Sequence, residues 1–323
     1  MDMKLSPQGS IWPPVIVPGL FVGALLLLHV FSGSWIAPQF FSIGSLTIHY
    51  YGITMALAVG AAWWLASKRA LQYGLAQEQV DTVSVWLVFG GLVGARLYHV
   101  LSSWQYYWQY PLESIKIWHG GLSIFGALIG GFIVLLVFVS RKAQRSGSVV
   151  EASGAPTQHY SFNILHLLDW LAPTVLLGQI IGRFGNFFNY EAFGYPTNLP
   201  WKMFVPEYFR PSNFLSASYF HPLFLYEALG NAVILLGLLY FFRPARRVKS
   251  SWRMPAGALF FSYLLLYNVL RYAIEHLRID STFLVDSIRL NALVSGALVI
   301  IGAAGLYWLH RQAKAASIID GTH

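Results

Sequence analysis

The chain has no cysteine and very few charged residues for its length. Only 11% of its 323 residues are Asp, Glu, Lys or Arg, whereas soluble domains average about a quarter. This scarcity excludes an ordinary soluble enzyme, because so few charged side chains cannot keep the surface of a folded chain of this length hydrated. The lack of cysteine excludes a disulfide framework and any thiolate nucleophile or ligand from this chain. The net charge of +8 is small and confined to a few loops, so nucleic acid is not an expected partner.

Long apolar runs take the place of the missing charge. Hydrophobic residues make up 56% of the chain, and a membrane-spanning helix needs about 20 consecutive, mostly apolar residues. Eight stretches meet this requirement, which predicts an all-α polytopic membrane protein. The predicted spans cover residues 15–33, 46–67, 82–102, 119–140, 163–183, 221–242, 256–277 and 289–309.

Basic residues are concentrated in alternate loops between these spans. Of the 21 Lys and Arg residues, 13 lie on one side, five on the other and three inside spans. The richer side is cytoplasmic by the positive-inside rule. No small-x-small cleavage site follows the first apolar run, so we interpret it as a retained helix rather than a signal peptide. Either interpretation leaves the remaining topology unchanged.

Two further features concern packing and the outer surface. Gly90/Gly94 and Gly126/Gly130 are small-xxx-small pairs, which let helices approach closely. Residues 187–220 lie in the largest external segment and contain four prolines and many aromatic residues. We expect this segment to form a structured external cap.

Three arginines lie inside predicted spans, where a charge is expensive. A centrally placed Arg costs about 2.5–3.5 kcal/mol on insertion scales, so it needs a partner, a wet cavity or a function. Arg96, Arg183 and Arg271 all fall in the outer part of spans that run from inside to outside. If these helices are neighbours, the three guanidinium groups form a cationic pocket suited to bidentate recognition of a phosphate.

Carboxylates are expected at the same depth. Arg271, Glu275 and Arg278 recur at i, i+4 and i+7, which places them on one helix face, so Glu275 can align an arginine. A single Arg–Glu pair could simply join two helices. Three arginines together with Glu191, Glu227 and Glu275 at one depth favour a functional site.

The densest polar run is G-R-F-G-N-F-F-N-Y-E-A-F-G at residues 182–194. It predicts a helix that reaches the outer surface with one Arg and two Asn at i+3 spacing. Its glycines permit a turn and close backbone approach. Asn and Arg supply hydrogen-bond donors and Glu supplies an acceptor, as a turn that binds a lipid headgroup requires.

This run resembles the G-R-x-G-N-F-x-N-x-E-x-x-G signature of the prolipoprotein diacylglyceryl transferase family. The resemblance implies a seven-helix core made of the second to eighth predicted spans. Residues 1–40 would then be an N-terminal extension with an extra helix, residues 41–312 the diacylglyceryl transferase-like membrane domain, and residues 313–323 a cytoplasmic tail. Further matching motifs are F-S-I-G and H-Y-Y-G within 41–52, G-A-R at 94–96, W-H-G-G-L-S at 118–123, Asp169 with A-P at 172–173, H-P and L-Y-E within 221–227, and Arg271 with Glu275 and Arg278.

The resemblance implies an enzyme that transfers the diacylglyceryl group of phosphatidylglycerol to the thiol of the lipobox cysteine in prolipoprotein signal peptides. Glycerol 1-phosphate would be released at the outer face of the bacterial cytoplasmic (inner) membrane. The expected partners are therefore phosphatidylglycerol, prolipoprotein signal peptides and membrane lipids. No cofactor or metal is expected, because the sequence has neither ligands grouped at metal spacing nor a glycine-rich nucleotide loop.

The resemblance also suggests roles for individual residues. Arg183 and Arg271 are expected to bind the phosphate and stabilise the leaving group, and Tyr51 matches a tyrosine that the family requires. The expected substrate-binding residues are Arg96, Asn186, Asn189, Glu191, Gly194, Tyr226, Glu227 and Glu275.

Phe125 is the main departure from the family pattern. Many members carry a His at this position, proposed as the base that takes the thiol proton, and phenylalanine cannot accept a proton. The His is then dispensable, or another group serves, or the chain is an inactive homologue that only binds phosphatidylglycerol. We favour the first explanation, because a Cys of pKa about 8.5 is already a few per cent thiolate at neutral pH. The candidate substitutes are His99, His119 and His221; a smaller departure is Asn291, where the family often has glutamine.

A lipid transporter is the main alternative from another functional class. Its intramembrane arginines would form a substrate pathway, and such proteins commonly show paired repeats with broken helices. The sequence has no evident internal repeat, and its charges are predicted in the outer part of the spans. Both features favour the enzyme.

Overall fold

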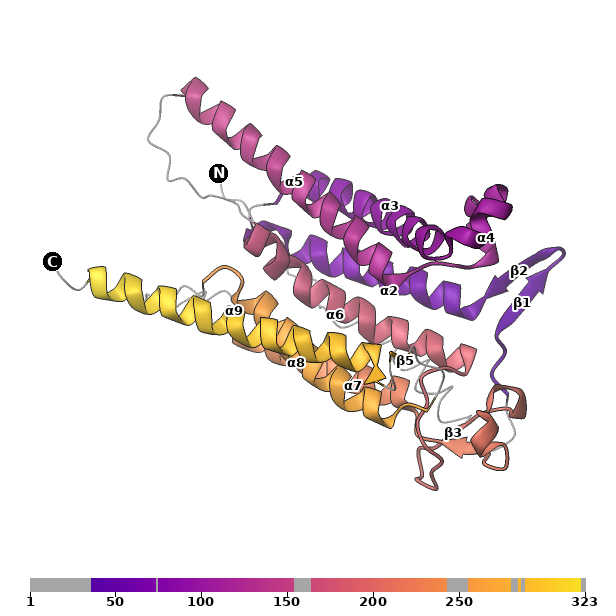
Figure 1. Cartoon of the computed structure of the whole chain (residues 1–323). Coiled ribbons are helices and arrows are strands. Elements are labelled where there is room, and N and C mark those ends of the chain that lie inside the picture. The colour runs from indigo at the N-terminus through magenta and orange to yellow at the C-terminus, as the bar shows by residue number, and fades with distance from the viewer. Residues whose placement is uncertain are drawn as a thin grey trace, which may run out of the picture. The chain divides into compact units, whose positions relative to one another are not determined.

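The computed structural model describes residues 36–73, 75–153, 164–242, 255–279, 284–285 and 288–320. The first predicted span, 15–33, lies outside the described residues. Long helices dominate the rest (Figure 1), and each of the second to eighth predicted spans corresponds to one of them. The expected all-α membrane fold class is therefore confirmed. The long helices are α2 (Tyr50–Arg69), α3 (Gln77–Ser102), α5 (Ile124–Ser153), α6 (Ile164–Asn189), α7 (Leu223–Phe241), α8 (Ala258–Leu277) and α9 (Leu290–Asp320).

Within the described residues, five helices are long and apolar enough to cross a membrane, namely α3, α5, α6, α7 and α9. Helices α2 and α8 are 20 residues long but less apolar. Arg271 and Glu275 lower the hydropathy of α8, and Lys68 and Arg69 end α2. Large apolar side chains on the apolar helices are exposed, such as Val233, which is the surface that a multi-pass protein presents to lipid.

The second predicted span starts later than expected. Residues 46–49 form strand β2 (Leu46–His49), which pairs antiparallel with β1 (Phe40–Ile43). The β-branched residues Thr47 and Ile48 favour a strand. Gly44 has a φ of 61°, the left-handed conformation that a tight hairpin turn requires. Helix α2 therefore begins at Tyr50.

The chain divides into two compact units, one containing the residues up to Trp64 and from Ala172 onward, the other Leu65–Leu171. In the second unit, α3 lies along α5 (Figure 1). The facing pairs are Gly94 with Gly126 and Gly90 with Gly130, and a Cβ on any of the four would collide with the opposite helix. The predicted packing role of these glycines is confirmed. This unit also contains α4 (Trp104–Gln109) and two 3₁₀ helices at Pro111–Ser114 and Ile117–His119.

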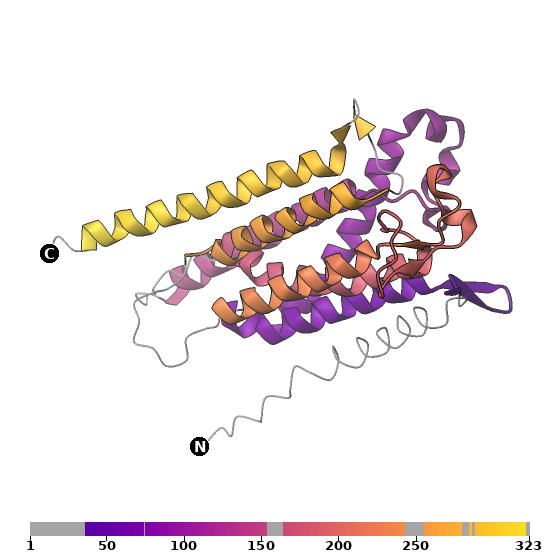
Figure 2. The same cartoon turned by 90° about the horizontal axis from the view of Figure 1, so that it is seen from below.

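In the first unit, α8 packs against both α7 and α9. Helices α6 and α8 finish, and α7 and α9 begin, at one common end of this unit. The β1–β2 hairpin and the short strands β5 (Leu284–Val285) and β6 (Ile288–Arg289) lie at that same end in both views (Figures 1 and 2). The predicted outer ends of these spans are thus brought together.

The predicted cap segment is folded, as expected. It contains the paired strands β3 (Met203–Phe204) and β4 (Tyr219–Phe220) and two 3₁₀ helices, Glu207–Phe209 and Ser212–Phe214. The Arg210 guanidinium donates hydrogen bonds to the carbonyl oxygens of Val205 at 2.8 Å and Leu215 at 2.9 Å. Aromatic side chains form the core beneath the cap, which includes the buried residues Phe187, Phe193, Phe220 and Phe224.

Candidate active site

Helix α6 ends in a strained turn that carries Glu191. After Asn189, both Tyr190 and Ala192 have a φ of 55°, which costs about 1–3 kcal/mol for residues other than glycine. The buried Tyr190 hydroxyl anchors the turn by donating to the Ala37 carbonyl oxygen at 2.9 Å. Burial raises the pKa of Tyr190 to about 12, so this donor persists at physiological pH. The Asn189 amide donates to Glu191 Oε1 at 3.4 Å.

Gly194 connects this turn to the end of α8. It forms an isolated antiparallel bridge with Arg278, and its N–H donates to the His221 carbonyl oxygen at 2.9 Å. A Cβ at position 194 would lie 2.8 Å from the Leu277 carbonyl oxygen. Only glycine therefore permits this approach, which fixes the backbone at Arg278.

Glu227 on α7 is the point where two arginines meet. Its Oε1 lies 2.5 Å from Arg183 Nη2 of α6, and its Oε2 lies 3.2 Å from Arg271 Nη1 of α8. The Tyr267 hydroxyl also donates to Oε1 at 3.4 Å. The Glu227 side chain is only 1% exposed, so three helices are joined through one buried carboxylate.

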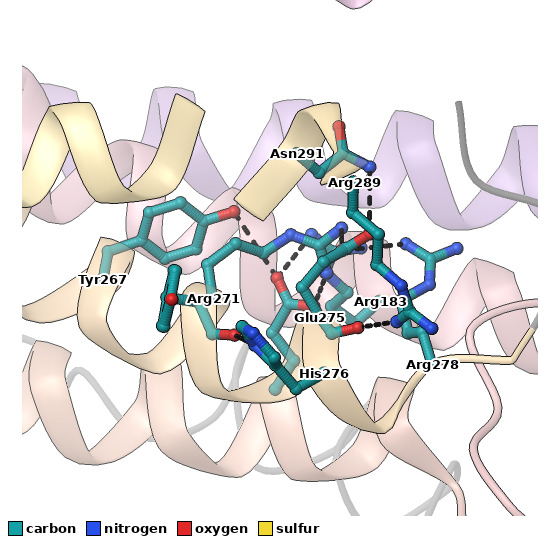
Figure 3. Close-up of polar contacts among 10 residues, drawn as sticks. Arg183, Tyr267, Arg271, Glu275, His276, Arg278, Arg289 and Asn291 are labelled. Carbon is teal, nitrogen blue, oxygen red and sulfur yellow. Dashed lines mark hydrogen bonds and ion pairs between the residues drawn. The ribbon is translucent and has the colours of Figure 1, made fainter. Parts of the chain in front are cut away.

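Glu275 on α8 is a second buried carboxylate, with a side chain that is 0% exposed. Its Oε2 lies 2.8 Å from Arg271 Nη2 and 3.9 Å from Arg278 Nη1. The Asn291 amide donates to Oε1 at 3.3 Å, and Arg289 donates to the Glu275 carbonyl oxygen (Figure 3). The Arg271 guanidinium thus bridges both carboxylates. We call this set the charge network, and its members are Arg183, Glu227, Tyr267, Arg271, Glu275, Arg278, Arg289 and Asn291.

The charge network contains more arginines than carboxylates. Four arginines and two carboxylates belong to it, and a third carboxylate, Glu191, lies nearby, since Glu191 and Arg183 are both within electrostatic range of Tyr51. The carboxylates are fully buried, while the side chains of Arg183, Arg271 and Arg278 are 12–20% exposed. Guanidinium groups held by buried acceptors are already oriented and need no rearrangement to receive an anion. Planar forks of this kind suit a phosphate group.

Tyr51 and Asn186 lie close to Arg183 of the charge network. The Tyr51 ring lies against α6 where Gly185 has no side chain, since a Cβ there would be 2.8 Å from Tyr51 Cδ2. Its hydroxyl is within electrostatic range of Glu191 and Arg183. Asn186 is partly buried, and its carbonyl oxygen accepts the Glu191 N–H at 2.9 Å. The structure therefore brings together Tyr51, Arg183 and the turn at residues 189–194 that follows α6, which we call the signature turn.

Tyr226 belongs to the cap rather than to the charge network. The Trp201 indole Nε1 donates to the Tyr226 hydroxyl at 2.8 Å, and His221 Nδ1 lies 3.0 Å from the same oxygen. Tyr226 thus joins the cap to the start of α7, while the next residue, Glu227, binds the arginines.

Arg96 occupies a different environment, in the second unit. Its side chain is buried, and all five of its N–H groups point at backbone carbonyl oxygens. The Tyr107 ring lies 5.3 Å from the guanidinium. Because every donor already has an acceptor, Arg96 holds the following loop in this structure. The acceptors are Glu113, Ser114 at 2.9 Å, Lys116 at 3.3 Å, Gly120 at 2.5 Å and Gly121 at 3.0 Å.

The histidine candidates and Phe125 are also placed, with one exception. His99 packs edge-on against Tyr107, with ring centroids 5.9 Å apart. The Phe125 ring lies 6.2 Å from that of Tyr98, so it fills space between α3 and α5. The side chain of His119 lies outside the described part of the chain.

Sequence reasoning did not assign four members of the network as site residues. Tyr267 precedes Arg271 by four residues, so extending the polar face of α8 by one turn would have identified it. Arg278 was placed on that face but not in the site. Arg289 and Asn291 follow a loop, and no local pattern links them to Glu275.

Long apolar helices, with a buried arginine–carboxylate network at one end of the first unit, define a polytopic membrane protein. The chain belongs to the prolipoprotein diacylglyceryl transferase family, whose model matches residues 38–308. Three relatives named phosphatidylglycerol–prolipoprotein diacylglyceryl transferase illustrate the similarity. That from Synechococcus elongatus is 39% identical over 84% of this chain and 87% of its own. Those from Synechocystis sp. (39%, covering 86% and 90%) and Nostoc sp. (38%, covering 89% and 93%) are similarly close.

Proposed function

We propose that this protein transfers the diacylglyceryl group of phosphatidylglycerol to the thiol of the lipobox cysteine of prolipoproteins and releases glycerol 1-phosphate. The reaction takes place at the outer leaflet of the bacterial cytoplasmic membrane. Family membership supports the reaction. The uneven distribution of Lys and Arg between loops supports the orientation.

The observation that carries the mechanism is the pair of guanidinium groups that one buried carboxylate holds in place. Arg183 and Arg271 come from separate helices, and both are held by Glu227. A phosphodiester carries one negative charge, and the phosphate monoester that leaves carries up to two. Two guanidinium groups that are oriented before the reaction therefore interact more strongly as the second negative charge develops, which is the requirement for stabilising a leaving group.

In the proposed step, the cysteine sulfur attacks the glyceryl carbon that carries the phosphate ester. A C–S bond forms, the C–O bond to phosphate breaks, and its electron pair leaves with glycerol 1-phosphate. The thiol proton passes to water before the attack. A cysteine of pKa about 8.5 is a few per cent thiolate at neutral pH, and nearby guanidinium groups raise that fraction. Arg183 and Arg271 bind the phosphate, and the 186–194 turn with Tyr51 shapes the site.

The remaining expected substrate-binding residues divide by their contacts. Glu227 and Glu275 act as positioning residues, because each binds arginines directly. Tyr226 supports the cap above the start of α7. Arg96 organises the 113–121 loop.

A transfer assay tests the proposal. Purified protein in phosphatidylglycerol micelles should add one diacylglyceryl mass to a synthetic lipobox peptide and release glycerol 1-phosphate in equal amount. A peptide with serine in place of the cysteine should stay unmodified. If no mass shift occurs while an active relative works in parallel, the transferase proposal is wrong, and binding of phosphatidylglycerol without transfer would support an inactive homologue. Net movement of intact lipid between leaflets would instead support the transporter.

Phe125→His tests whether the missing family histidine matters. Because the thiolate is accessible without a dedicated base, we expect the transfer rate to change by less than about tenfold, which is 1.4 kcal/mol. Initial rates across pH 6–9 measure the effect, with Phe132→His on the same helix as the matched control. A much larger gain confined to position 125 would show that the absent base is a real deficit.

A further inference from the structure

A groove of about 830 Å³ runs between α3 and α5 and is built wholly from second-unit residues. One end is charged and polar, with Glu78 and Gln79 from the start of α3 and Arg141 and Lys142 from α5. Lys142 Nζ donates to Gln79 Oε1 at 3.4 Å across this end. The two helices are antiparallel here, so the groove is amphipathic along its length.

The other end of the groove is apolar. Trp86 of α3 and Val134, Val137 and Phe138 of α5 line it. Both helices meet the criteria for membrane spans, so this part of the groove opens where acyl chains are the surrounding solvent. A ligand that fits both ends has a polar anionic head and a long apolar tail.

We propose that this groove binds one anionic phospholipid, with its phosphate on Arg141 and Lys142 and an acyl chain along Trp86 and Val137. Basic pockets between membrane helices on the cytoplasmic side are typical lipid-headgroup sites, and the loop distribution of Lys and Arg predicts that side for this end. The site is separate from the charge network and does not depend on the proposed transfer reaction.

The charges of the groove select the class of headgroup. Among the lining residues, Arg141 and Lys142 are basic and Glu78 is acidic. A lipid head with a net negative charge fits the two basic groups better than a zwitterionic head does. Arg141 makes no ion pair or hydrogen bond with any side chain in the described ranges, and its guanidinium is exposed. The Glu78 carboxylate can accept hydrogen bonds from headgroup hydroxyls, as in phosphatidylglycerol.

Fluorescence quenching at Trp86 tests this site directly. The full chain is placed in phosphatidylcholine micelles, and lipids with brominated acyl chains are added as phosphatidylglycerol, phosphatidylethanolamine or phosphatidylcholine. Subtracting the Trp86→Phe variant isolates the Trp86 signal. We expect phosphatidylglycerol to be preferred at Trp86 by at least about fivefold, the preference that one basic group provides. Arg141→Gln/Lys142→Gln should remove this preference.

The matched control is Arg311→Gln/Lys314→Gln, which removes two basic residues of α9 that do not line the groove. The control should leave the preference unchanged. Equal quenching by phosphatidylglycerol and phosphatidylcholine in the unaltered protein would overturn the proposal. So would equal quenching by phosphatidylethanolamine, or a preference that survives the groove variant. None of these results depends on transferase activity.

Discussion

Arg271→Gln is expected to lower the rate of diacylglyceryl transfer by at least about a hundredfold, with Arg183→Gln close behind. Removing one preorganised donor to a developing negative charge typically costs a factor of about 10²–10³. Arg271 binds Glu227 through Nη1 at 3.2 Å and Glu275 through Nη2 at 2.8 Å. Arg271→Lys should rescue little, because one ammonium group cannot reproduce the planar fork between two carboxylates.

Initial transfer rates at saturating phosphatidylglycerol measure this effect, and membrane insertion and thermal unfolding show that each variant is folded. Arg311→Gln is the matched control, since Arg311 is exposed on α9 and lies outside the network. Its rate should equal that of the unaltered protein. Full activity in a folded Arg183 or Arg271 variant would overturn the phosphate role of the network.

Glu227→Leu is expected to have the largest effect on stability. Glu227 compensates Arg183 and Arg271 while being almost wholly buried, and removing one partner of a buried ion pair costs about 3–5 kcal/mol. Thermal unfolding of the purified variant should therefore occur at clearly lower temperature. The isosteric Glu227→Gln should lower the unfolding temperature less than Glu227→Leu does. It should still slow transfer at least tenfold, because an amide does not hold two guanidinium groups in place.

Glu207→Gln provides the control for Glu227, since it removes an exposed carboxylate from the cap. Such surface changes usually stay within about 0.5 kcal/mol. If Glu227→Leu unfolds at the same temperature as the control, the arginines are compensated by other groups. The electrostatic account of the network would then be wrong.

The helical framework is predictable because each span is a local property of the chain. The 19 residues of α7 are apolar except for a few polar side chains such as Glu227 and Asn231, and the helix boundaries differ from the predicted 221–242 by only a few residues. The start of α2 was less predictable. Residues 46–49 are apolar enough to extend the following membrane helix, but the turn at Gly44 and the pairing with Phe40–Ile43 place them in a strand.

The signature turn shows how much of the site could be predicted from residues that are close together in the sequence. Arg183 and Glu191 were identified from residue types and spacing, and the structure places both near Tyr51. The left-handed residues Tyr190 and Ala192 were not foreseeable, because neither side chain favours that conformation. The buried contact of Tyr190 with Ala37, far away in the chain, over-determines the turn.

By itself, the amino-acid sequence determined that this is a multi-pass membrane protein of the diacylglyceryl transferase type. The reason is that the length of each apolar run and the order of the motifs are properties of the linear chain. Only the tertiary structure decided which of the intramembrane arginines lie together. Arg183 and Arg271 share Glu227, while the N–H groups of Arg96 donate to carbonyl oxygens of the 113–121 loop. The reason is physical: a buried guanidinium takes whichever acceptors the folded backbone brings within reach, and sequence spacing cannot specify those acceptors.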